Sequence, residues 1–295
     1  MPCLQVKGFA GLELCGNGYS IHNFPTHHVE ELLGYLLLNQ NKACGRDNLI
    51  ELLWPYEVSK NSRACLNTVL WRLRCLFRQM GYKAQSFLCS TRDYIIFAPR
   101  EDLQFDVASF ESHLEVAWTA EEDNIKLVEL TKAIDLYQGD LYTGIYCDWC
   151  LLERERLARK YLQALGELMY CHIRLQDYDK AIEFGQIILE IDPLREEVHH
   201  ALISCYGRLG YRAEALAQFQ LCTHYLMHEV QVLPMPDTVL TFQQAMAGCA
   251  NNYLDTQSSE LLKPAHRALA QFQQAGNELH KILSEIDRSK TFTSV

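Results

Sequence analysis

The segment NSRACLNTVLWRLRCLFRQM, residues 61–80, decides the fold of the first part of this chain. At 100° per residue, one side of a helix over this segment gathers apolar side chains, namely Leu66, Leu70, Leu73 and Phe77. The opposite side gathers polar and aromatic groups, namely Asn67, Thr68, Trp71, Arg72, Cys75 and Arg78. The segment therefore predicts an amphipathic helix that packs on a core through one face, and Gly81 ends it.

The flanking sequence predicts the elements that would supply this core. Residues 3–24 are short alternating apolar pieces with a hairpin-turn signal at Asn17-Gly18, which predicts a small antiparallel sheet. Leucines at helical spacing predict two helices, over residues 26–37 and 46–54. Residues 87–97 predict two short strands around a polar turn. Sheet, three helices and hairpin follow one another in the order of a winged helix-turn-helix.

From Val107 onward the periodicity is helical almost throughout, and the chain overlays on itself at an offset of 34 residues. At that offset Ala181 meets Ala215, and residues 178–191 and 211–226 both predict the second helix of a pair. Thirty-four residues is the period of tetratricopeptide (TPR) repeats. We describe these units as TPR-like, because the Trp, Gly and Tyr signature positions are largely absent.

Residues 259–289 predict a last helix with apolar residues at the a and d positions of nearly four heptads. Such a helix implies a partner helix, from the same chain or from a second copy in a homodimer. The candidate docking or dimerisation residues are Leu262, Leu269, Phe272, Leu279, Leu283 and Ile286.

The expected fold is therefore mainly α, with three parts. A winged helix-turn-helix DNA-binding domain, made of a small β-sheet, three helices and a wing hairpin, is predicted for residues 1–100. An all-α TPR-like domain is predicted for residues 101–250, and the amphipathic segment for residues 251–295.

The net charge of −10 is unevenly distributed. Residues 1–100 hold 11 Lys and Arg against 7 Asp and Glu, whereas the remainder holds 16 against 30. Residues 58–92 contain no acidic side chain. A local basic surface of this kind can bind phosphates although the whole chain is acidic.

The predicted helix over residues 61–80 fits the major groove of double-stranded DNA, where Asn and Arg side chains discriminate between bases. The candidates for base contact on its outward face are Asn67, Thr68, Trp71 and Arg72. The candidates for phosphate contact are Arg46, Lys60, Arg63, Arg74, Arg78, Lys83 and Arg92. The alternative is that these residues form an ordinary solvated charged face. Three features argue against it: the segment has no compensating acidic residues, its Trp faces outward, and it is the third helix in the order of sheet, three helices and hairpin.

Other constellations favour structural roles. Cys147-x-x-Cys150 has redox or metal spacing but lacks further ligands, and His224 and His228 lie one helical turn apart without a third ligand. His27-His28 has no obvious carboxylate partner in the sequence. The twelve cysteines fit reduced thiols. Because no phosphate-binding loop, nucleophile elbow, metal motif or catalytic carboxylate pair is present, we expect no enzyme, no cofactor and no metal.

Neither a membrane-spanning stretch nor a signal peptide is recognisable, so a cytoplasmic protein without membrane contact is expected.

Several short motifs follow one another along the chain. In the first part these motifs are Arg46-Asp47-x-Leu49, Leu53-Trp54-Pro55, Asn61-Ser62-Arg63-x-x-Leu66 and Arg72-Leu73-Arg74. In the second part they include Phe105-Asp106-Val107-x-x-Phe110, Tyr137-x-Gly139-x-Leu141, Trp149-x-x-x-Glu153-Arg154 and Asp192-Pro193-Leu194-Arg195-Glu196. Together these motifs resemble SARP-type regulators, antibiotic regulatory proteins with an OmpR/PhoB-type winged helix and a bacterial transcriptional activator domain. The resemblance covers roughly residues 4–245 and leaves the tail outside.

The resemblance implies binding to direct repeats near a promoter, contact with RNA polymerase and activation of nearby genes. Family members are often more basic in the helix over residues 61–80, whereas this chain has Thr68, Trp71 and Cys75 there. An unknown protein or small-molecule effector could bind the TPR-like part. The alternative interpretation is a TPR-type adaptor that binds a protein partner without sequence-specific DNA binding.

Overall fold

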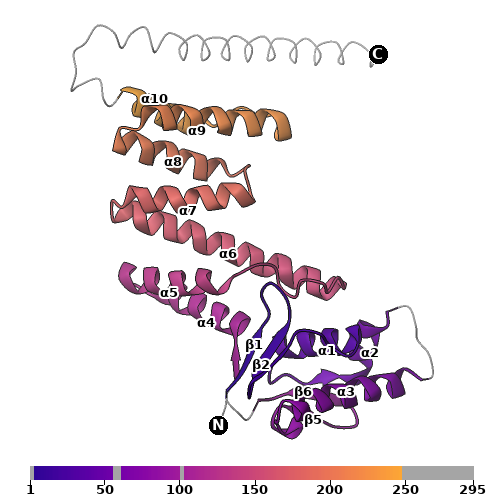
Figure 1. Cartoon of the computed structure of the whole chain (residues 1–295). Helices are drawn as coiled ribbons and strands as arrows, with labels where there is room; N and C mark the ends of the chain where they lie inside the picture. Colours follow the sequence, from indigo (N-terminus) through magenta and orange to yellow (C-terminus); the bar gives the residue numbers. More distant parts are fainter. Residues whose placement is uncertain (1–2, 56–60, 100–102, 248–295) are drawn as a thin grey trace, which may run out of the picture.

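The computed structural model describes residues 3–55, 61–99 and 103–247. Figure 1 shows a small mixed α and β part at the N-terminal end, followed by helices stacked one after another. The predicted fold class is confirmed by this arrangement. Lys60 and the candidate docking residues Leu262, Leu269, Phe272, Leu279, Leu283 and Ile286 lie outside the described residues.

The first sheet has the strand order β3-β2-β1-β7. The strands β1 (Leu4–Lys7), β2 (Glu13–Gly16) and β3 (Tyr19–Ile21) are antiparallel neighbours, as predicted. The turn between β2 and β3 has positive φ at both Asn17 and Gly18, the requirement of the tight hairpin turn that these residues favour. The strand β7 (Leu103–Phe105) pairs in parallel with β1, so a strand from beyond residue 100 completes this sheet.

Three helices and a second sheet complete the winged helix. They are α1 (His27–Leu38), α2 (Arg46–Leu53) and α3 (Ser62–Gln79), and α1 packs against both α2 and α3. The wing is the antiparallel pair β5 (Leu88–Ser90) and β6 (Tyr94–Phe97), joined to α3 through a 3₁₀ turn, η1 (Ala84–Ser86). A short strand, β4 (Cys44–Gly45), pairs with β6 and leads directly into α2.

The second part is a stack of helices, in which each helix packs on its neighbours in sequence. In chain order the helices are α4 (Asp106–Thr119), α5 (Asp123–Leu136), α6 (Asp148–Arg174), α7 (Tyr178–Ile191), α8 (Glu196–Leu209), α9 (Arg212–Tyr225) and α10 (Pro236–Ala247). A π-helical turn, η2 (Leu226–Val230), follows α9. The pairs α6–α7 and α8–α9 are the two TPR-like units, and α10 packs against α8 and α9.

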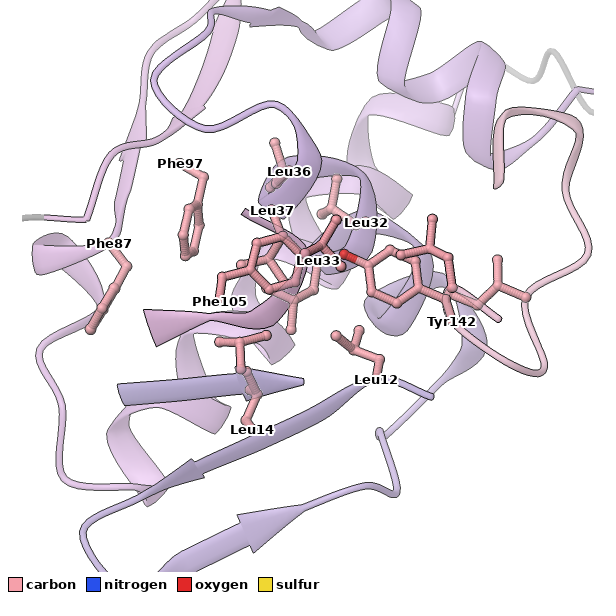
Figure 2. Close-up of a cluster of buried hydrophobic side chains, with 14 of the residues drawn as sticks. Leu12, Leu14, Leu32, Leu33, Leu36, Leu37, Phe87, Phe97, Phe105 and Tyr142 are labelled. Carbon is pink, nitrogen blue, oxygen red and sulfur yellow. The ribbon is translucent and has the colours of Figure 1, made fainter. Parts of the chain in front are cut away.

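One hydrophobic core joins the winged helix to the first helices of the stack. Tyr142 is its largest fully buried side chain. Tyr142 lies in the loop between α5 and α6 and donates a hydrogen bond to the carbonyl oxygen of Gly34 in α1, with an O–O distance of 3.1 Å. Figure 2 shows the Tyr142 ring among the leucines of α1. A Cβ atom at Gly34 would stand 2.9 Å from the Tyr142 ring, so glycine allows the close approach.

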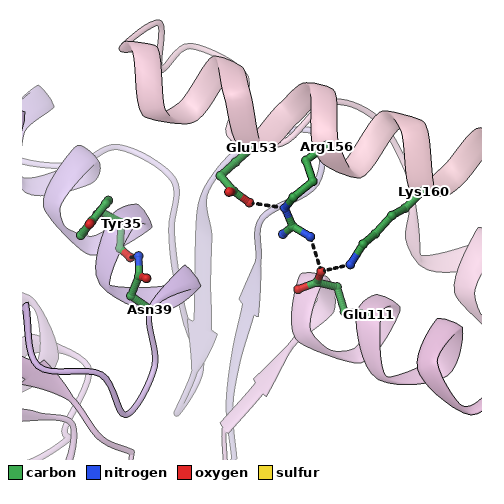
Figure 3. Close-up of polar contacts among 6 residues, drawn as sticks. All are labelled: Tyr35, Asn39, Glu111, Glu153, Arg156 and Lys160. Atoms are coloured by element: carbon green, nitrogen blue, oxygen red, sulfur yellow. Dashed lines mark hydrogen bonds and ion pairs between the residues drawn. The ribbon is translucent and has the colours of Figure 1, made fainter.

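Polar contacts fix the first helices of the stack and the loop between α5 and α6. Arg154 of α6 donates hydrogen bonds to the carbonyl oxygens of Leu141, Tyr142 and Ile145, which fixes the loop that carries Tyr142. Glu111 of α4 accepts hydrogen bonds from Arg156 and Lys160 of α6, as Figure 3 shows. The winged helix is anchored to this part of the stack by Tyr142 and by the backbone N–H groups of Gly8 and Phe9, which donate to the Asp106 carboxylate at the start of α4.

Candidate nucleic-acid interface

The two faces of α3 lie as the sequence predicts. Leu66, Leu70, Leu73 and Phe77 are buried, and Val69 and Leu76 join them. On the outward face Asn67, Thr68 and Arg78 are exposed, while Arg72, Arg74 and Cys75 are partly exposed. The Trp71 side chain is 58% exposed, unusual for a residue that mostly lies at least partly inside proteins. An exposed Trp on a basic helix is available for contact with a partner.

Arg46, the first residue of α2, connects α3 to the wing. Its Nη1 donates to Asn67 Oδ1 at 2.9 Å, its Nη2 donates to Ser90 Oγ at 2.8 Å, and its Nε donates to the Thr91 carbonyl oxygen at 2.9 Å. The sequence predicts a phosphate contact for Arg46 and a base contact for Asn67. In the structure the two side chains bind each other, and no local signal in the sequence could have shown this, because they are 21 positions apart.

Positive charge is concentrated at the start of α2 and along α3. Partial burial, then the nearby charges of Arg74 and Arg63, lower the pKa of Arg46. Arginine nevertheless stays protonated in proteins, so the cluster remains cationic. Arg63 forms an exposed ion pair with Asp47 at 2.9 Å. An exposed pair of this kind contributes little to stability, so Arg63 is free to exchange Asp47 for a phosphate.

The wing turn is ordered by Thr91. Its backbone N–H donates to the Tyr94 carbonyl oxygen at 2.9 Å, and its hydroxyl oxygen accepts hydrogen bonds from the N–H groups of Asp93 and Tyr94. Arg92 is exposed in this turn, and Lys83 is exposed just before η1. The structure thus distributes the phosphate candidates around α3, with Arg92 on the wing and Arg78 near the end of the helix.

The Cys147-x-x-Cys150 motif lies at the start of α6. Cys147 is the residue before α6 and Cys150 is buried. Burial raises the pKa of the Cys147 thiol and raises that of Cys150 to about 12. Reactive thiols of Cys-x-x-Cys motifs have lowered pKa values instead. This pair therefore lacks the electrostatics of a redox site.

No group of three metal-ligating side chains comes together within residues 3–55, 61–99 and 103–247. The rings of His224 and His228 are tilted by 44° to each other with centroids 4.4 Å apart, and both residues are exposed. The expectation that His27 has no carboxylate partner was wrong, because its Nε2 lies 3.1 Å from Glu31 Oε1, one helical turn along α1.

Of the helices that the structure describes, none combines the length and apolar character needed to cross a bilayer.

A cavity of about 390 Å³ lies in the helical stack between the end of α6 and α8. Tyr170, Arg174, His200 and Arg208 contribute polar groups to its lining, and Ile173, Tyr178, Ala201 and Cys205 contribute apolar surface. Arg174 is also paired with Asp123 at 2.7 Å. The cavity is therefore lined by residues of both TPR-like units.

Comparisons with known proteins agree with this architecture. A family model described as bacterial transcriptional activator domain matches residues 105–244. Regulatory protein AfsR of Streptomyces coelicolor is 26% identical over 212 residues, covering 70% of this chain and 20% of AfsR. Regulatory protein AfsR of Streptomyces griseus is 23% identical over 233 residues, covering 79% of this chain and 23% of that protein. The chain thus spans about a fifth of the length of these relatives.

The fold resembles that of Mycobacterium tuberculosis EmbR, solved in complex with a low-affinity phosphopeptide. The TM-score is 0.70 at 17% sequence identity, and the likeness covers 92% of this chain and 72% of EmbR. It supports one architecture for the whole described chain, from β1 to α10. Residues 105–244 therefore match the bacterial transcriptional activator domain, and the resemblance of the chain to SARP-type transcriptional regulators is confirmed.

Proposed function

We propose that this chain is a sequence-specific DNA-binding regulator of transcription, in which α3 enters the major groove. The observation that carries the proposal is the outward face of α3, where the exposed Trp71 precedes Arg72 on a helix that also carries Arg63, Arg74 and Arg78. Asn67, Thr68, Trp71 and Arg72 would contact base edges. Phosphates would be bound by Arg63, Arg74, Arg78, Lys83 and Arg92, which fix the position of the protein without reading sequence.

The proposal extends to activation. The resemblance to SARP-type regulators supports binding to promoter-proximal repeats and contact with RNA polymerase, and the activator-domain match over residues 105–244 supports the helical stack as the regulatory part. Acting by binding rather than by catalysis, such a regulator needs no cofactor and works in the cytoplasm, where bacterial DNA lies. The acidic stack would be held away from the phosphates by the junction around Tyr142.

A second function is favoured by one feature, the cavity between α6 and α8. Its lining of aromatic, apolar and cationic groups suits a protein or small-molecule effector, and a TPR-type adaptor would use the same surface without sequence-specific DNA binding. The outward Trp71 on a basic helix is better explained by DNA, because an adaptor has no need of it.

Titration of the full chain with the DNA upstream of its own gene, and with a shuffled duplex of equal composition, separates the two functions. A sequence-specific regulator should bind the natural duplex about 10³-fold more tightly or better, with affinity falling as salt rises. Equal, salt-independent affinity for both duplexes would favour the adaptor. Because log affinity falls with log salt in proportion to the phosphates contacted, the salt series also measures the electrostatic part.

A further inference from the structure

The cavity between α6 and α8 is lined by equivalent positions of the two TPR-like units. Arg174 and Arg208 are 34 residues apart, which is the offset at which the chain overlays on itself, and both line the cavity. Tyr170 and Ser204 form a second pair at the same offset. The last turns of α6 and α8 therefore build the cavity together, and a bound molecule would contact both units.

The two arginines differ in the groups that they bind. Arg174 donates to both carboxylate oxygens of Asp123, from Nη2 at 2.7 Å and from Nε at 3.2 Å. Arg208 is exposed, and it forms no ion pair or hydrogen bond with any residue of the ranges 3–55, 61–99 and 103–247. Burial raises the pKa of the Cys205 thiol in the cavity wall to about 11, and the Arg208 charge opposes this rise. The cavity therefore has one guanidinium without a counter-charge.

Charge distinguishes this cavity from the rest of the helical stack. Residues 101–295 hold 30 Asp and Glu against 16 Lys and Arg, whereas the described residues that line the cavity include two arginines and no acidic side chain. A histidine, His200, also lines it and is held by a hydrogen bond of 2.6 Å between its Nε2 and Thr241 Oγ1 of α10. Guanidinium groups bind carboxylates and similar anions through strong, charge-assisted hydrogen bonds. The lining therefore favours an anion.

Gln176, a further lining residue, occupies a position where the repeat favours glycine. It lies in the turn after α6 with a φ of 60°, and 34 positions later Gly210 lies in the turn after α8 with a φ of 77°. This left-handed conformation costs free energy for a residue that has a Cβ atom, but not for glycine. Local conflicts of this kind are expected at functional sites. A ligand that the Gln176 amide binds would account for this choice of residue.

We propose that the cavity binds a small organic anion, in which an apolar ring system carries one carboxylate or similar acidic group. Arg208 and Gln176 would bind the acidic group, and the rings of Tyr170 and Tyr178 would contact the apolar body. The volume of about 390 Å³ lies in the range of small-ligand sites, about 300–1,000 Å³. The proposal adds an effector site to the regulator and does not rest on DNA binding, because none of these residues belongs to the winged helix.

Fluorescence titration of the full chain with two dyes tests the proposal. Anilinonaphthalene sulfonate is the anionic probe, and phenylnaphthylamine has the same ring system without the sulfonate. Arg208→Gln should weaken binding of the sulfonate by roughly 10-fold, the usual effect of losing a hydrogen bond to a charged group. It should leave the affinity for phenylnaphthylamine nearly unchanged, because only the sulfonate needs the guanidinium.

Arg159→Gln is the matched control, because Arg159 is a 70% exposed arginine of α6 outside the lining, and it should bind both dyes like the wild-type protein. Gln176→Gly should weaken binding of the sulfonate and raise the melting temperature, since glycine adopts a positive φ without strain. A residue with only a structural role would not give these opposite changes.

The proposal is overturned if Arg208→Gln or Gln176→Gly binds the sulfonate as tightly as the wild-type protein. It is also overturned if Arg208→Gln weakens the binding of both dyes equally. Neither titration involves DNA, so the cavity proposal can fail while DNA binding by α3 holds, and the reverse.

Discussion

At the scale of the residue, single side chains connect parts of the chain that are distant in sequence. Tyr142 lies 108 positions after Gly34 and donates to its carbonyl oxygen, and its backbone has a positive φ of 46°. Such a conformation is costly for a residue other than glycine and persists only where the surroundings determine it. The sequence motif around Tyr137 and Leu141 marked this region through a family resemblance, but no local pattern predicts where the Tyr142 ring is buried.

Substitution of Tyr142 tests the junction. Tyr142→Phe removes the hydroxyl that donates to Gly34 and should lower the free energy of unfolding by about 1 kcal/mol. Tyr142→Ala also leaves a cavity in the core and should cost about 3–5 kcal/mol. Urea unfolding followed by circular dichroism measures both. Tyr146→Phe, at a 71% exposed residue of the same loop, is the control and should change little. Equal effects of Tyr142→Phe and Tyr142→Ala would contradict the packing described here.

At the scale of the element, hydrophobic periodicity predicts the helices but misses short strands that are defined by pairing with a distant strand. The stripe of Leu66, Leu70, Leu73 and Phe77 is enough to predict α3 and its two faces, because burial repeats with the helical period. The 34-residue offset likewise predicts the pairs α6–α7 and α8–α9. The strands β4 and β7 were missed, because two or three residues carry no period and are defined by β6 and β1, their distant partners.

In the candidate site, too, the sequence predicts local features but not the contacts between residues that are distant in sequence. The outward orientation of Trp71 and Thr68 follows from the helical wheel, and the structure agrees. The wheel also places Asn67 outward, but it cannot show that Arg46 donates to the amide oxygen, because α2 and the wing reach Asn67 only in the folded chain. Exposure is therefore predictable from the sequence, whereas the hydrogen-bonding state of an exposed group is not.

The stability that the antiparallel strands β1, β2 and β3 contribute to the fold should depend on pH. Glu13 accepts hydrogen bonds from Ser20 and Lys7, in that order of effect, which lowers the pKa of its carboxyl to about 2. A lowered folded-state pKa gives stability that is present above the unfolded pKa of about 4.3 and is lost as pH falls toward 2. Because the Glu13 side chain is partly exposed, the contribution should be at most about 1 kcal/mol.

Glu13→Gln should therefore be less stable than the wild-type protein near pH 6, and the difference should shrink as the pH falls from about 5 to 2.5. Thermal unfolding at a series of pH values measures this difference. Glu51→Gln, on the exposed side of α2, is the control and should show a much smaller difference. A Glu13→Gln difference that grows on acidification would show that these hydrogen bonds do not stabilise the folded state.

At the scale of the whole molecule, the sign of the charge distinguishes the two parts of the chain, whereas the hydrophobic core joins them. The basic residues 58–92 and the acidic helical stack differ in sign, whereas one hydrophobic core runs from the winged helix into α4, α5 and α6. The shared core holds the two parts together, and the basic helix α3 lies in the winged helix at one end of the molecule (Figure 1). The sequence predicts the charge division directly, but not the shared core, since the contacts that build it cross the expected boundary at residue 100.

DNA binding by the outward face of α3 is the central claim, and fluorescence anisotropy of the full chain on labelled upstream DNA tests it most directly. Trp71→Ala and Arg72→Ala should each weaken binding by about 10-fold or more, since each removes a base-edge contact. Trp118→Ala, at a 36% exposed Trp on α4, should bind like the wild-type protein. All variants should keep the wild-type melting temperature to within a few degrees. If Trp71→Ala and Arg72→Ala bind as tightly as Trp118→Ala, α3 is not the DNA-binding element and the account is contradicted.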